Sequence, residues 1–225
     1  MDKQHSIADF VFKSMEKVYS NIRALIDDAV LLYKKSQFPR ASFCAMTAIE
    51  ETGKLWILSL QHMKATTNGN YKPDSQKLTK ILTDHTGKAL QMAVHSLFIN
   101  AGADRRHGMH PKSGIHRSTG VVLLARSGEW MEWRNKCCYV DVDFSTSKSE
   151  GCQDAIDKSI AYYFICMAYE GLAEVTDAEV WLEVLDELNE FMKLYGKEAE
   201  LDKLDFLANS DKYEKLALSR KTRKG

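Results

Sequence analysis

The chain has 225 residues, 44% hydrophobic and 28% charged, which is the composition of a soluble globular protein with one sizeable core. Its formal net charge is zero, no apolar run approaches the ~20 residues that span a bilayer, and the N-terminus lacks the pattern of a secretion signal. The five cysteines show no CxxC spacing, so we expect a cytoplasmic protein without a disulfide framework or a membrane partner.

The first two helices are predicted to form a hairpin. Apolar residues recur at helical spacing from Ile7 to Leu32, which predicts a long first helix ending before Pro39. Proline is accepted in the first turn of a helix, so a second helix should begin near Phe38 after a cap at Ser36. The two helices should lie antiparallel across a tight turn.

The second helix, residues 38–60, is predicted to be central because it is apolar on all sides. One side carries a stripe of mostly small residues that lets another backbone approach: Ala41, Ala45, Ala48, Thr52, Leu55 and Ser59. Polar residues interrupt this helix at Glu50, Glu51, Gly53 and Lys54. Either Glu50 and Lys54 form a helical ion pair while Gly53 admits a close neighbour, or one of the glutamates supports a functional site.

The middle of the chain alternates between loops and helices. We expect a surface loop over residues 65–75, a third helix from Leu78 to Phe98, and a long loop over residues 100–118. Residues 121–133 favour a helix, although a pair of strands around Ser127 and Gly128 also fits the pattern.

The last third should be helical after one extended link, residues 137–143. Ser147 and Glu150 form a capping-box pattern that predicts a central helix continuing to Leu172. An amphipathic helix should follow from Asp177 to Tyr195, and residues 197–225 should hold one or two short helices. The fold class is therefore all-α: a four-helix up-down bundle (residues 1–175) with a C-terminal helical extension and basic tail (residues 176–225).

Charge is unevenly distributed along the chain. Residues 104–136 hold seven Lys/Arg against three Asp/Glu, whereas residues 137–200 hold fifteen acidic residues against four basic ones. A polyanion should therefore meet the protein through residues 104–136, unless this charge is merely solvated.

Two clusters in this basic segment could act on a phosphodiester, which needs a cation to hold the phosphate and a group that moves a proton. The first contains Arg105, Arg106 and His110, and the second contains Arg134, Asn135, Lys136 and Tyr139. An Arg fork can bind phosphate oxygens and a His can act as acid or base near neutral pH, whereas Tyr is a poorer proton shuttle. A solvated basic turn and a helix-end arginine are the alternative interpretations.

Neither a metal site nor a phosphate-binding loop is predicted. His107 and His110 give HxxH in a Gly/Pro-containing loop, but there is no HExxH and no Glu-x-x-His pair on facing helices. No glycine-rich loop follows a strand, so no cofactor is expected.

The sequence resembles the HEPN superfamily and, within it, the AbiV-type abortive infection proteins of bacteria. The resemblance covers roughly residues 20–175, and two segments carry it: AVLLYKKSQFPRASFCAMTAIEETGKLWIL, with its Glu-Glu-x-Gly-Lys signature, and RNKCCYVD. Many HEPN proteins are homodimeric, metal-independent ribonucleases whose motif is Arg, a polar residue, a short spacer and His at the start of the last core helix. By position Arg134 and Asn135 match this motif, and Tyr139 stands where His is expected.

The resemblance implies a phage-defence effector that cleaves RNA by attack of the ribose 2′-OH. Arg134 and Arg105 would hold the phosphate, Arg106 and Lys136 would add substrate contacts, and His110 or Tyr139 would move the proton. Glu50, Glu51 and Lys54 would support the site, and the expected partners are a second copy of the chain, RNA and a phage-encoded activator protein. The alternative is a catalytically inactive helical protein that binds a phage or host protein, and a nucleotide- or metal-binding bundle ranks third.

Overall fold

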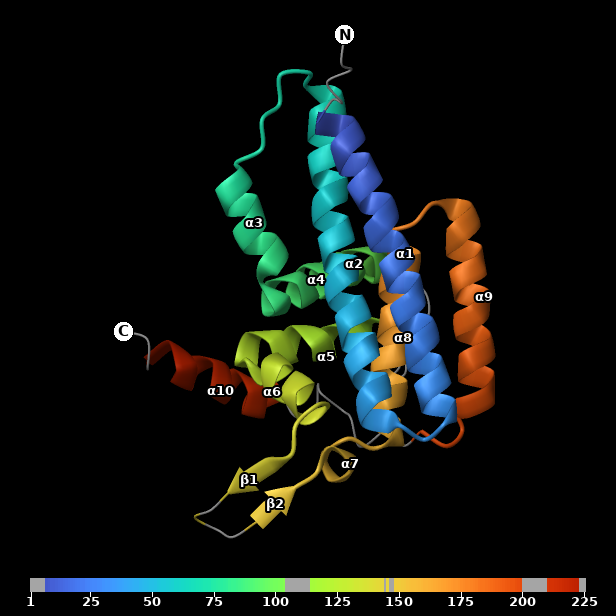
Figure 1. The fold of residues 1–225 in the computed structure, drawn as a ribbon, viewed down its shortest axis with the longest axis vertical. Coiled ribbons are helices and arrows are strands. Elements are labelled where there is room, and N and C mark those ends of the chain that lie inside the picture. The colour runs from blue at the N-terminus through green and yellow to red at the C-terminus, as the bar shows by residue number, and fades with distance from the viewer. Residues whose placement is uncertain (1–6, 104–113, 144, 146–147, 200–209, 223–225) are drawn as a thin grey trace.

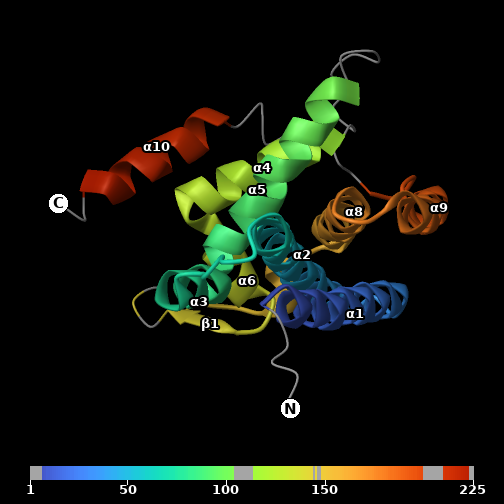
Figure 2. The same ribbon diagram turned by 90° about the horizontal axis from the view of Figure 1, so that it is seen from above.

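The computed structural model describes residues 7–103, 114–143, 145, 148–199 and 210–222. The all-α prediction is confirmed, with one small two-stranded hairpin added. Four helices of the described part run along the long axis of the molecule, and α4 and α5 lie across them (Figures 1 and 2). The long-axis helices are α1 (Ile7–Lys34), α2 (Phe38–Thr67), α8 (Lys158–Glu174) and α9 (Ala178–Tyr195). The other helices are α3 (Ser75–Thr83), α4 (His85–Ala103), α5 (Gly114–Ser127), α6 (Glu129–Lys136), α7 (Cys152–Ala155) and α10 (Ser210–Thr222).

The predicted hairpin of α1 and α2 is confirmed, with a different cap. Gln37 occupies the N-cap position of α2 and makes no side-chain cap hydrogen bond, and Pro39 lies in the first turn. Ser36 instead adopts a left-handed conformation with φ 57°. The turn closes through the Gln37 amide, which donates to the Leu32 carbonyl at 2.9 Å. The expected cap at Ser36 is therefore wrong, because this residue makes the turn itself.

Helix α2 is the centre of the fold, as predicted, and it packs against α1, α4 and α8. Ala41, Ala45 and Ala48 in its stripe are fully buried. Gly53 allows the closest approach, because a Cβ atom at this position would lie 1.9 Å from the carbonyl oxygen of Lys88 in α4. The prediction that Gly53 admits a close helix neighbour is thus confirmed.

The predicted third helix is two helices. The chain breaks at Asp84, whose backbone is extended and whose Oδ1 accepts a hydrogen bond from the Gly87 amide at 3.0 Å. Asp84 therefore ends α3 and caps α4, as an N-terminal Asp commonly does. The long loop predicted over residues 100–118 is also too long, because α4 continues to Ala103 and α5 begins at Gly114.

The helix favoured over residues 121–133 is confirmed, and it is interrupted at Gly128, where φ is 77°. The extended link predicted over residues 137–143 is in part a strand: β1 (Asp141–Asp143) pairs antiparallel with β2 (Lys148–Glu150). Glu150 therefore lies in a strand instead of a capping box, and Ser147 lies outside the described residues. Helix α8 begins later, where Asp157 Oδ1 accepts from the amides of Ser159 and Ile160.

The C-terminal helices pack on this core. Helix α9 lies against α8, and Phe191 meets the ring of Tyr33 in α1 edge to face at 5.4 Å. Arg23 of α1 also pairs with Glu187 of α9 at 2.6 Å. Helix α10 packs on α5 (Figure 2), and its Tyr213 is buried. None of the helices in the described ranges combines the length and hydropathy that crossing a membrane requires.

Candidate functional site

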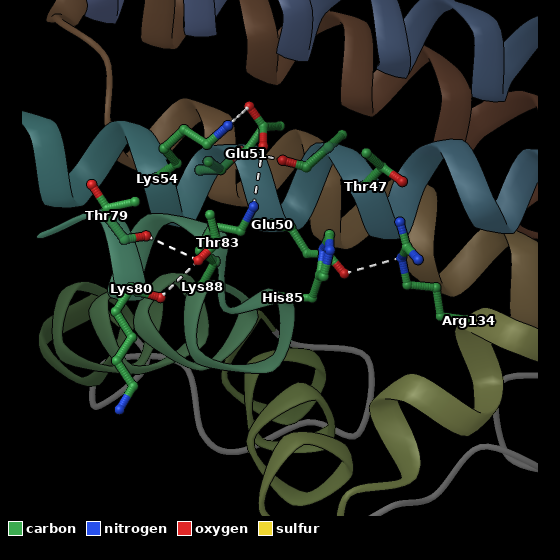
Figure 3. A network of polar contacts seen from close by, with 12 residues as sticks. Thr47, Glu50, Glu51, Lys54, Thr79, Lys80, Thr83, His85, Lys88 and Arg134 are labelled. Atoms are coloured by element: carbon green, nitrogen blue, oxygen red, sulfur yellow. Dashed lines mark hydrogen bonds and ion pairs between the residues drawn. The ribbon is translucent and has the colours of Figure 1, made fainter. Parts of the chain in front are cut away.

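A buried carboxylate joins three helices at the centre of the molecule. Glu50 lies in the middle of α2, and its side chain is 1% exposed. Burial of a carboxylate is costly unless hydrogen bonds and opposite charge compensate for lost hydration. Glu50 Oε1 accepts a hydrogen bond from Trp130 Nε1 at 2.9 Å and faces Arg134 Nε at 3.3 Å, while Oε2 lies 2.7 Å from His85 Nδ1. We call these four residues the Glu50 cluster, and Figure 3 labels Glu50, His85 and Arg134 of it.

Arg134 lies in the last turn of α6, and two contacts fix its guanidinium group. Its Cζ atom lies 4.7 Å above the centre of the Phe43 ring, a cation–π geometry. Its buried Nε is close enough to Glu50 for an ion pair, although the angle does not meet hydrogen-bond geometry. Among the described residues, no group hydrogen bonds to its terminal nitrogens, and 19% of the side chain is exposed. Within the described part of the chain these nitrogens can therefore receive an anion.

His85 is one of two members of the cluster that were not predicted from the sequence. It is the first residue of α4, its imidazole is 45% exposed, and it reaches Glu50 across 35 residues of sequence. The single helix predicted from Leu78 to Phe98 places it inside a helix. The overlooked signal is Asp84, a capping residue that places His85 at the start of a helix instead of inside one. Trp130 was also missed, because nothing in its local pattern predicts a buried acceptor 80 residues away.

Glu51, the residue after Glu50 in α2, forms a separate ion pair with Lys54. Lys54 Nζ lies 2.5 Å from Glu51 Oε2, and the buried Lys88 of α4 lies 3.3 Å from Oε1. The ion pair of Glu50 with Lys54, one of the two interpretations of the sequence, is therefore wrong. Lys54 pairs with Glu51, and Glu50 contacts residues of α4 and α6. Figure 3 shows both carboxylates of α2 directed toward side chains of other helices.

The other residues of the Arg134 motif are exposed. Asn135 and Lys136 end α6, and Tyr139, which is 69% exposed, follows three residues later. The Tyr139 amide donates to the Asn135 carbonyl at 2.9 Å, so this short segment stays folded against the helix end. The β-hairpin and α7 separate the motif from α8. Arg105, Arg106 and His110 lie outside the described residues.

The thiols beside the motif are poor nucleophiles. Burial raises the pKa of Cys137 to about 12, so this thiol stays protonated near neutral pH. Burial also raises the pKa of Cys138, and the nearby positive charge of Arg134 opposes this effect only in part. Within the ranges that the structure describes, no three His, Cys, Asp or Glu side chains gather as metal ligands would.

The Glu50 cluster can therefore bind an anion and exchange a proton at one place. The carboxylate fixes Arg134 before any ligand arrives, so little reorganisation is needed when negative charge is bound. The same carboxylate orients an imidazole, which is the side chain best suited to proton transfer near neutral pH.

Comparison with protein families gave one match that covers most of the chain. A family model for the AbiV proteins of the HEPN type matches residues 10–173. The matched region includes every member of the Glu50 cluster. Comparisons with curated proteins and with solved structures gave no match.

Proposed function

The chain belongs to the AbiV family of HEPN abortive-infection proteins, and from this premise we propose that it is a metal-independent endoribonuclease. It would cleave RNA through attack of the ribose 2′-OH on the adjacent phosphate. The family places the chain among phage-defence proteins, and the ribonuclease activity is the step added by this proposal.

The observation that carries the proposal is the state of Arg134. Its guanidinium group is anchored by Glu50 and Phe43, and its terminal nitrogens face no described hydrogen-bond acceptor. Such a fork matches two oxygens of a phosphate group. As negative charge builds on the phosphate during attack, a guanidinium group held in place stabilises the transition state more than a mobile one does. Exposed Asn135 and Lys136 supply further contacts to the RNA backbone.

Incubation of the purified protein with total RNA, with and without a chelator, tests the proposal. We expect cleavage in both conditions for wild type and none for Arg134→Ala. Arg134→Lys keeps the charge but lacks the fork, so it should be partly active at most. Arg40→Ala is the matched control, because Arg40 is exposed at the start of α2 and outside the Glu50 cluster. Full activity of a folded Arg134→Ala would refute the proposal, as would inert wild type in the presence of its cellular trigger.

RNA binding separates the contact from the chemistry. Arg134→Ala should bind RNA more weakly than wild type, and the dependence of its affinity on salt should be shallower by about one released counterion. Arg40→Ala should keep both the affinity and the salt dependence of wild type.

A homodimer is part of this proposal, and exposed apolar side chains support it. Tyr139 and Val140 are 69% and 62% exposed in the segment that follows α6. Apolar side chains adjoining a candidate site are typical of surfaces that another chain covers. A second copy would place two Arg134 motifs beside one RNA strand, and a phage-encoded activator would control the dimer.

A second candidate function is binding of a phage or host protein without catalysis. Two observations favour it: Tyr139 in the place where the motif has His, and the exposed side chains of Trp181 and Leu182 on α9. The RNA incubation decides between the two functions, because a binding scaffold leaves RNA intact.

A further inference from the structure

We infer that His85, oriented by Glu50, is the catalytic residue that takes the proton from the ribose 2′-OH. This inference rests on the proposed function, and it assigns the proton transfer to a residue outside the Arg134 motif. It also gives a chemical purpose to the buried carboxylate of α2.

The hydrogen bond to Glu50 fixes which ring nitrogen of His85 can act. Glu50 accepts a hydrogen bond from Trp130 at Oε1 and faces Arg134 Nε with the same oxygen, so Oε2 is the oxygen that meets His85. In the tautomer that donates to this carboxylate oxygen, His85 Nδ1 carries the hydrogen and lies 2.7 Å from Oε2. This leaves Nε2 as the lone-pair nitrogen of the neutral ring. Among the described residues, no group hydrogen bonds to Nε2, and 45% of the side chain reaches solvent.

The position of His85 suits the phosphate that Arg134 would hold. Both side chains contact the same carboxylate, His85 through Oε2 and Arg134 through Oε1. One carboxylate group therefore bridges the two side chains and keeps them close together. Figure 3 shows them on the same side of α2. A phosphodiester gripped by the guanidinium fork would bring its neighbouring 2′-OH within reach of the imidazole.

The reaction balances with the groups present. The 2′-oxygen forms a bond to phosphorus as its proton passes to His85 Nε2, and Glu50 stabilises the imidazolium that results. The bond from phosphorus to the 5′-oxygen breaks with its electron pair, and that oxygen takes a proton from solvent. The products are a 2′,3′-cyclic phosphate and a 5′-hydroxyl, and His85 returns its proton to water.

His62 and His95 do not suit this role. His62 meets the Ala8 carbonyl and the ring of Phe12 at the far end of the hairpin. His95 is stacked on Trp56 at 3.7 Å, its Nε2 lies 3.3 Å from the Glu174 carbonyl, and burial lowers its pKa. Neither ring contacts the Glu50 cluster.

A purely structural role for His85 is the competing explanation, in which the imidazole only ties α4 to α2. That tie already exists one turn away, where Gly53 meets the Lys88 backbone and Lys88 pairs with Glu51. An anchor would also be better buried than a ring that is 45% exposed.

His85→Asn separates these explanations. The amide nitrogen of Asn can replace Nδ1 as the donor to Glu50, but it cannot accept a proton near neutral pH. We expect His85→Asn and His85→Ala to bind RNA within about twofold of wild type and to cleave it roughly 10²- to 10⁴-fold more slowly. Added imidazole should restore part of the activity of His85→Ala and none of that of Arg134→Ala. His62→Ala is the control and should cleave at the wild-type rate, and the thermal unfolding of each variant checks its fold.

The outcomes distinguish this inference from the proposed function. If wild type cleaves RNA, Arg134→Ala does not, and His85→Asn cleaves within a few-fold of wild type, the inference is wrong and the proposed function stands. If His85→Ala loses activity but imidazole restores none, while His85→Asn remains active, His85 is only an anchor. If wild type cleaves no RNA, both proposals fail together.

Discussion

Replacement of Gly53 by alanine should destabilise the protein, although alanine is the better helix former. In an ordinary helix interior, Gly→Ala gains about 1 kcal/mol of stability. At Gly53 the new Cβ would lie 1.9 Å from the carbonyl oxygen of Lys88 and 2.7 Å from its carbonyl carbon. Both atoms belong to the backbone of α4, so no side-chain rotation relieves the contact.

The size of the stability loss follows from how far α4 must move. The Lys88 oxygen has to retreat from 1.9 Å to at least the 3.4 Å of ordinary van der Waals contact. Overpacking of this kind costs about 1–3 kcal/mol, and a clash between two backbones belongs at or above the upper end. After subtraction of the helix-propensity gain we expect a net loss of about 2 kcal/mol. For a chain of this length that loss lowers the Tm by roughly 4–8 °C.

Two other glycines provide matched controls for thermal unfolding. Gly69→Ala meets nothing within 4 Å and should leave the Tm unchanged. Gly171→Ala meets the Sδ of Met92 at 2.8 Å, and a flexible side chain can move, so its effect should stay below that of Gly53→Ala. A Tm of Gly53→Ala at or above wild type would refute the reasoning. Gly53→Leu, with a larger side chain at the same contact, should be less stable still.

Three further results are expected. Glu50→Ala leaves Trp130 without its acceptor and Arg134 without its ion-pair partner, and it should lower the free energy of unfolding by about 3–5 kcal/mol in urea titration, whereas exposed Glu16→Ala should change it little. Burial lowers the pKa of His95 below the usual 6.5, so below that pH the unfolded chain binds the proton more readily. Stability should therefore fall from pH 7 to pH 5, and a His95→Phe variant with an unchanged slope would contradict this origin. Light scattering at micromolar concentration should give twice the 25.6 kDa of one chain, and a mass of one chain would end the dimer proposal.

The hairpin of α1 and α2 could be predicted because its signals are local. Helical spacing of apolar residues, Pro39 at a helix start and small residues along α2 each depend on near neighbours in sequence. Gly53 belongs to the same class, since a glycine inside a good helix signals a close contact.

The partners of Glu50 could not be predicted in this way. A carboxylate four residues before a lysine favours a local pair, yet Glu50 contacts residues that are 35 and 80 positions away. Tertiary packing decides which pairs form, because α4 brings Lys88 to Glu51 and His85 to Glu50. Such long-range choices require the fold itself.

Two further errors have physical reasons as well. The apolar pattern continues across Asp84, so periodicity joined α3 to α4 although the residue that separates them is a typical cap. The β-hairpin lacks an Asn-Gly or Asp-Gly turn, which is the strongest local signal for paired strands. The pattern of residues 137–143 therefore predicts an extended link instead of a paired strand.

The chemistry of the RNA ends tests the central claim most directly. A defined RNA should be cleaved in the presence of chelator to a 2′,3′-cyclic phosphate and a 5′-hydroxyl, as mass spectrometry of the fragments can report. The same RNA with a single 2′-deoxy nucleotide at the cleavage position should resist wild type at that position, because the attacking oxygen is missing. Cleavage of the deoxy-substituted RNA at that position, or fragments that end in a 5′-phosphate and a 3′-hydroxyl, would contradict attack by the 2′-OH at the Arg134 site.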